Sequence, residues 1–258
     1  MNSYEDLPLL KPPVWTWEVP TYFFVGGAAG ASAVLAAVAQ VTGAGEELVR
    51  DARWIAAAGS ALSAPLLISD LGRPERFLHM LRVFKVQSPM SVGAWTLAAF
   101  GTASSASAFA QLVGERTNLP VKVIGDASAM LSAATGAVMA TYTGVLLGAT
   151  AIPIWSKHVT MLPVHFGASA LGSAVSLLEL RGHRHAALNS LGLGAAIFET
   201  LANFAIEERV SPMAAAFSGP IPLALRLLGA RKGAAASTLL GSLLTRFAWV
   251  QAGKTSLR

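Results

Sequence analysis

Apolar residues gather in long runs along this chain, separated by short polar connections. A helix needs about twenty mostly apolar residues to cross the hydrocarbon core of a bilayer, and eight runs approach that length. They cover residues 19–41, 53–68, 90–113, 124–152, 158–180, 186–206, 212–228 and 234–251. The run at 53–68 is short and the run at 212–228 contains Pro220 and Pro222, so seven spans is the alternative count.

These runs predict helices rather than strands. They are much longer than the alternating segments of about ten residues that build outer-membrane barrels, and an open sheet cannot satisfy its backbone hydrogen bonds in lipid. The connections are short, which indicates a single membrane domain over residues 1–258. We therefore predict an all-α integral membrane fold with about eight transmembrane helices, in which residues 1–157 form a first four-helix bundle and residues 158–258 form a second.

The composition excludes a soluble domain and several kinds of cofactor site. The chain is 53% hydrophobic and only 13% charged, whereas soluble domains usually carry about 25% charged residues. It has no cysteine, so it cannot hold an iron–sulfur cluster through thiolates, a catalytic thiol or a disulfide. No pair of its five histidines faces across two predicted helices, so we expect neither haem nor a metal site. No basic patch with interleaved aromatic residues occurs, and we expect no nucleic-acid partner.

Three segments stand out against the apolar background, and the first is residues 15–27. Tryptophan and tyrosine favour the membrane interface, and Pro20 suits the first turn of a helix. Glu18 would then be a carboxylate at the mouth of the bundle. The alternative is an ordinary aromatic belt with a solvated glutamate.

The second segment, residues 68–85, is dense in charged and aromatic residues. Asp70 closes the second predicted helix, and Arg76 and His79 are three positions apart, so one helical turn would place them on one side. This mixture favours a formed pocket, and the alternative is a positively charged loop.

The third segment, residues 139–155, contains Tyr142 within an apolar run. Its hydroxyl needs a partner in lipid, so we expect it to face the bundle or a cavity. A plain interhelical hydrogen bond is the alternative. Trp155, after Pro153, is typical of an interface anchor.

Ionisable residues also occur at membrane depth, where they are costly and therefore functional candidates. They are His165, Glu179, Glu199 and Arg246. Two interpretations remain open, a relay that moves protons and paired charges that hold helices together.

These segments resemble the NrfD/polysulfide reductase membrane-subunit family. The resemblance lies in WEVPTYFFVGG at 17–27, DLGRPERF at 70–77, SPMSVGAW at 88–95, YTGVLL at 142–147 and PIW at 153–155, and it covers the first four predicted helices. It implies a haem-free subunit in a prokaryotic inner membrane that exchanges electrons with menaquinone or ubiquinone. It also implies a ferredoxin-like iron–sulfur subunit as partner and, through that subunit, a catalytic subunit that often carries molybdopterin.

The resemblance implies a quinone site at one end of the first bundle, where an even number of spans would bring the three segments together. Tyr142 and His79 could donate hydrogen bonds to the quinone, and Glu18 or Asp70 could exchange its protons. The expected quinone contacts are Trp17, Tyr22, Arg73, Arg76 and Trp155. The same site could also drive proton translocation. Two other functions remain as alternatives, a secondary transporter or channel and a passive membrane anchor without quinone chemistry.

Overall fold

The computed structural model describes residues 13–117, 121–206 and 210–256, and these residues contain helices and no strand. The predicted all-helical fold is therefore confirmed. Three helices of this described part, α1 (Glu18–Thr42), α5 (Lys122–Gly148) and α7 (Met161–Leu180), are long and apolar enough to cross a membrane. The count of eight spans and their division into two bundles stay predictions.

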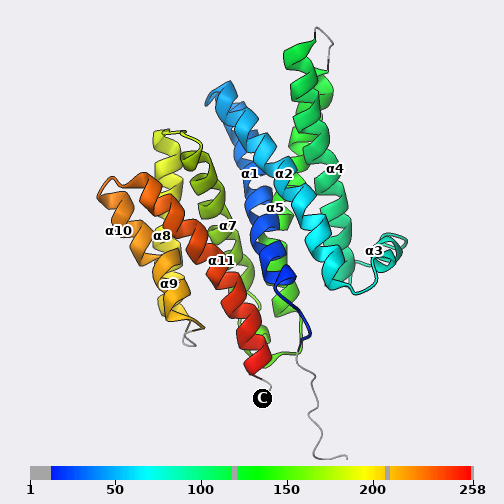
Figure 1. Cartoon of the computed structure of the whole chain (residues 1–258), viewed down its shortest axis with the longest axis vertical. Helices are drawn as coiled ribbons and strands as arrows, with labels where there is room; N and C mark the ends of the chain where they lie inside the picture. The colour runs from blue at the N-terminus through cyan, green and yellow to red at the C-terminus, as the bar shows by residue number, and fades with distance from the viewer. Residues whose placement is uncertain (1–12, 118–120, 207–209, 257–258) are drawn as a thin grey trace, which may run out of the picture.

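Successive long helices run in opposite directions (Figure 1). The other long ones are α2 (Glu46–Asp70), α4 (Pro89–Arg116), α8 (Ala186–Ala205) and α11 (Arg231–Thr255), and the short ones are α3 (Glu75–Met80), α6 (Pro153–Ser156), α9 (Pro212–Ser218) and α10 (Pro220–Leu227). Helices α1, α2, α4 and α5 pack on one another, and α7 to α11 pack on one another. Each group contains four helices when α9 and α10 are counted as one broken helix.

Helix α1 joins the two groups, because it contacts α2 and α5 on one side and α7 and α11 on the other. Small residues make this possible. A Cβ on Gly30 would lie 2.3 Å from the carbonyl oxygen of Gly136 in α5, so the two backbones touch where the helices cross. Close packing of this kind is the usual source of helix association in lipid.

Two predicted helices end differently in the structure. The helix predicted at 124–152 ends at Gly148, and a turn and the short helix α6 follow it. The helix predicted at 212–228 is broken at Gly219 into α9 and α10. Pro220 follows at once and cannot continue the hydrogen bonding of α9, while Gly219 lies against the α8 backbone, where a Cβ would be 2.8 Å from the nitrogen of Thr200.

Candidate functional site

Two carboxylates from different helices meet at the end of the molecule where α1 begins and α2 ends. Glu18 is the first residue of α1 and Asp70 is the last residue of α2. The backbone N–H and the hydroxyl of Thr16 lie 3.3 and 3.2 Å from Asp70 Oδ1, and the hydroxyl also contacts Glu18 Oε2. A hydroxyl has one proton, so Thr16 can donate it to only one carboxylate at a time. Both acids are partly exposed, and we call them the Thr16 carboxylates.

A stack of tryptophans follows directly from this pair. The rings of Trp15 and Trp155 are stacked with centroids 5.3 Å apart, and Trp155 is fully buried. The indole N–H of Trp155 donates to the carbonyl oxygen of Trp249 at 2.8 Å, so its single donor is already used. Trp155 therefore connects Trp15, which precedes α1, to α11. Trp17, by contrast, is 61% exposed.

Two tyrosines are buried at the same end of the first helix group. Tyr22 follows Glu18 by about one helical turn, and both Tyr22 and Tyr142 are buried. The hydroxyl of Tyr142 donates to the carbonyl oxygen of Pro89, the first residue of α4, at 2.7 Å. This is an interhelical hydrogen bond, and it leaves the phenol oxygen able to accept another proton donor.

The basic residues of the second segment lie apart from the Thr16 carboxylates. Gly72 adopts a left-handed conformation with φ 67° directly after α2, and α3 then lies beside the start of α4 (Figure 1). Arg73, Arg76 and His79 are exposed. Within the described ranges, no hydrogen bond or ion pair joins these three residues to either carboxylate.

A second group of ionisable side chains is buried between α7, α8 and α11. His165 Nδ1 lies 3.7 Å from Glu199 Oε1, and both side chains are almost fully buried. Arg246 is 1% exposed, and its Nη2 donates to the carbonyl oxygen of Phe166 at 3.0 Å, next to His165. Several atoms of this group lack a hydrogen-bond partner among the described residues, namely His165 Nδ1, both Glu199 carboxylate oxygens, Arg246 Nε and Arg246 Nη1.

Glu179, the fourth predicted relay residue, has a different environment. Arg226 in α10 donates to its two carboxylate oxygens at 2.9 and 2.7 Å, and both side chains are buried. This bidentate geometry satisfies the carboxylate and connects α7 to α10. The structure thus brings His165 and Glu199 together and gives Glu179 a partner of its own.

The family model described as "Polysulphide reductase, NrfD" matches residues 9–187, which is more than half of the chain. The chain belongs to the NrfD family. No curated protein matches it. NrfD proteins are membrane proteins. They are generally subunits of oxidoreductase complexes, in which they work with iron–sulfur and catalytic subunits.

The NrfD match separates the two groups of candidate residues. It covers α1 to α7, and with them the Thr16 carboxylates and both tyrosines. It also covers His165 but ends at the start of α8, so Glu199 and Arg246 lie outside it.

Sequence reasoning missed a polar layer at the opposite end of the first helix group. Arg53 is buried in α2, and its Nη2 donates to Gln40 Oε1 at 2.7 Å and to Asp126 Oδ1 at 3.2 Å. A hollow of about 830 Å³ lies over this layer. The sequence pattern that could have predicted this layer is the spacing of Arg53, Ser60 and Ser63. These residues lie on one face of α2 and are all buried.

Asp51 is a further acid at that end, ahead of the predicted span at 53–68. It accepts hydrogen bonds from Arg181 Nε at 2.7 Å and from Nη2 at 3.0 Å, and His183 Nε2 lies 2.9 Å from it. The hydrogen bonds from Arg181 hold the pKa of Asp51 below its usual value, against the opposing effect of burial. This cluster connects α2 to the end of α7.

Proposed function

We propose that this NrfD protein is the quinone-reactive membrane subunit of a respiratory oxidoreductase in a prokaryotic inner membrane. It would pass electrons between menaquinone or ubiquinone and a ferredoxin-like iron–sulfur subunit, which leads to a catalytic subunit, often with molybdopterin. The observation that carries this proposal is the link through Thr16 between Glu18 and Asp70. It gives two adjacent acids at the end of the first helix group that also contains the buried Tyr22 and Tyr142.

The chemistry of a quinol explains why these groups suit it. A quinol that loses a pair of electrons also releases a pair of protons, and the reverse reaction takes them up. Glu18 and Asp70 are partly exposed, so either carboxylate can hold a proton and pass it to water. The Tyr142 hydroxyl donates its hydrogen bond to the carbonyl oxygen of Pro89, so its oxygen can accept a hydrogen bond from a quinol hydroxyl. Trp17 and Tyr22 would border the headgroup.

The iron–sulfur subunit would dock on α3 and the connection that follows it. This surface carries exposed basic side chains, which are Arg73, Arg76, Arg82 and Lys85. It also carries exposed apolar side chains, which are Leu78, Val83, Phe84 and Val86. A mixture of arginines with apolar residues is typical of protein interfaces, and the positive charge suits a partner with an acidic surface. His79 belongs to this surface and would act near the partner.

Proton translocation would use the buried group of α7, α8 and α11. His165 and Glu199 are an acid and a base 3.7 Å apart, which one water molecule could bridge. Arg246 would hold a negative charge on Glu199 at the moment of transfer. The Arg226 partner of Glu179 favours the other interpretation for that residue, a charge pair that holds helices together.

The test replaces the Thr16 carboxylates one at a time and together, as Asp70→Asn and Glu18→Gln. The complex should still assemble, and its catalytic subunit should still turn over with a soluble electron carrier. Quinol turnover should fall by about a hundredfold in the double variant, which is the size of effect expected for lost acid–base groups.

Glu47→Gln is the matched control, because Glu47 is an exposed acid at the opposite end of α2. It should leave quinol turnover unchanged. Normal quinol turnover in an assembled Glu18→Gln/Asp70→Asn complex would contradict the proposed site.

A further inference from the structure

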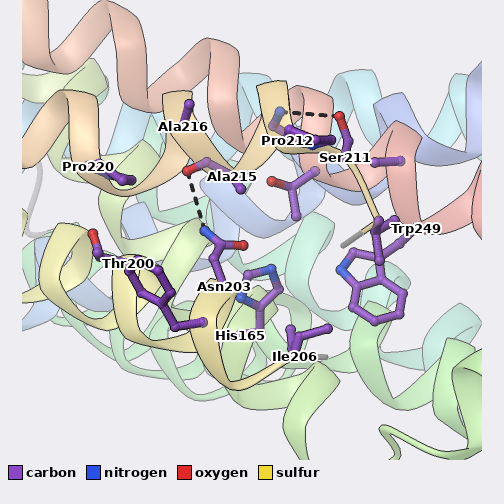
Figure 2. A pocket seen from close by; sticks show the side chains of 15 residues that line it. His165, Thr200, Asn203, Ile206, Ser211, Pro212, Ala215, Ala216, Pro220 and Trp249 are labelled. Atoms are coloured by element: carbon purple, nitrogen blue, oxygen red, sulfur yellow. Dashed lines mark hydrogen bonds between the residues drawn. The ribbon is translucent and has the colours of Figure 1, made fainter. Parts of the chain in front are cut away.

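The second helix group contains a cavity that the proposed quinone site at the Thr16 carboxylates does not use. Its volume is about 290 Å³, and it lies between α7, α8, α9 and α11. Figure 2 shows His165 at its wall, between Asn203 and Trp249 and facing α9. The apolar part of the wall includes Phe204, Ile206, Pro212, Ala248 and Trp249.

Most of the polar groups in this wall are already bonded to neighbouring backbone. The hydroxyls of Thr200 and Thr245 donate to the carbonyl oxygens of Ala196 and Gly241. The hydroxyl of Ser211 accepts the backbone N–H at the start of α9, and the amide of Asn203 donates toward α9. None of these groups points to a ligand by itself.

His165 is the exception. It is 1% exposed, and its Nδ1 has no hydrogen-bond partner among the described residues. The nearest charged atom recorded for it is Glu199 Oε1 at 3.7 Å, which is beyond hydrogen-bond distance. A buried ring nitrogen without a partner is costly, and the side chain that carries it lines the cavity.

The wall suits a flat organic ring better than a cluster of water. By volume, the cavity could hold about ten water molecules. Each buried water needs two to four polar partners, however, and apolar cavities stay dry. This wall is largely apolar, includes the aromatic residues Trp249 and Phe204, and carries the imidazole of His165. Apolar walls with a single directing polar group are typical of small-molecule sites.

We propose that this cavity is a second binding site for a planar, lipid-soluble molecule with a ring carbonyl or hydroxyl, as in a quinone headgroup. The ring oxygen would share a hydrogen bond with the imidazole of His165, and the ring would lie against Trp249. The proposal rests on the proposed function, which makes quinones the available ligands. It concerns binding only, at a place separated from the Thr16 carboxylates by the Trp155–Trp249 contact.

The experiment uses a short-chain azidoquinone as photoaffinity label on the purified whole complex, followed by peptide mapping. We expect labelled peptides from two places, the Thr16 carboxylates and the cavity wall at 200–206, 210–216 and 245–249. Ala248→Phe fills the cavity and should remove the second label while the first label stays. Ala236→Phe is the matched control, because Ala236 is an exposed alanine of the same helix, and it should keep both labels.

His165→Phe tests the hydrogen bond separately, because it keeps a ring and removes Nδ1. Labelling of the cavity should weaken about tenfold, the loss expected for one good hydrogen bond. An azidobenzene without a ring carbonyl should label the cavity no better in the native protein than in His165→Phe.

Three results would overturn the proposal. The cavity could remain unlabelled while the first place is labelled, which would leave the proposed function intact. Ala248→Phe could leave the cavity label unchanged. Labelling of neither place would reject this inference and the proposed function together.

Discussion

At the residue scale, the buried glutamates of the second helix group differ in what surrounds them. Glu179 accepts two hydrogen bonds from Arg226. A Cβ on Gly192 would lie 2.2 Å from the Arg226 guanidinium, so the absence of a side chain at Gly192 leaves room for the pair. Glu199 accepts none among the described residues, and its nearest recorded partner is His165. The first arrangement keeps a charge in place, and the second leaves a proton acceptor open.

Removal of one member of the Glu179–Arg226 pair should destabilise the protein strongly. Glu179→Ala leaves Arg226 buried without compensation, which should cost about 3–5 kcal/mol of unfolding free energy. The paired replacement Glu179→Leu/Arg226→Met removes both charges and should restore most of the stability. Thermal unfolding of the purified subunit, followed by circular dichroism, measures both. A Glu179→Ala protein as stable as the native one would contradict the structural role.

The sequence predicted part of this residue-scale picture. Glu18 and Asp70 could be placed at one end because successive helices alternate in direction. The role of Thr16 could not be predicted, since it depends on the path of the chain before α1. Nor could the partner of Glu179, because Arg226 is 47 positions away and hydropathy does not show which helix faces α7.

At the element scale, some helix ends are predicted by nearby residues in the sequence and others are not. Helix α1 starts where Pro20 and the flanking aromatic residues predict it. The end of α5 has no such local signal, because the next proline is Pro153. Gly148 lies against Val159, where a Cβ would be 2.9 Å from the Val159 Cα. The end of α5 therefore depends on a contact made by residues that follow it, and a reading of local patterns cannot include that contact.

The crossing of α1 and α5 supplies the element-scale prediction. Gly30→Ala would place a Cβ against the Gly136 carbonyl and should cost about 1–3 kcal/mol of stability by overpacking. Gly101→Ala is the matched control, because a Cβ there meets no heavy atom within 4 Å. Alanine has the higher helix propensity, so the control should be neutral or more stable by up to about 1 kcal/mol. Thermal unfolding compares the two, and equal stability of both variants would argue against a close crossing.

At the scale of the whole molecule, the two ends of the described chain meet. Lys254, near the end of α11, donates to the carbonyl oxygen of Trp15, and Trp15 stacks on Trp155. The beginning of α1, the end of α2, α6 and the end of α11 therefore lie at one end of the molecule (Figure 1). The prediction of eight spans agrees with this closure when α9 and α10 together make one pass.

The closure gives a direct test of eight spans against seven. The chain has no cysteine, so a single introduced cysteine is its only thiol and reports one position. Eight passes place Ser156→Cys and Thr255→Cys on one side of the membrane, and Glu47→Cys and Lys232→Cys on the other. All four positions are exposed. A membrane-impermeant maleimide applied to vesicles of both orientations should therefore label them in these two pairs.

If α9 and α10 do not cross, Lys232→Cys would label with Ser156→Cys, and Thr255→Cys would change to the other side. That exchange would reject the even closure, because the contact between Lys254 and Trp15 could not exist across a bilayer.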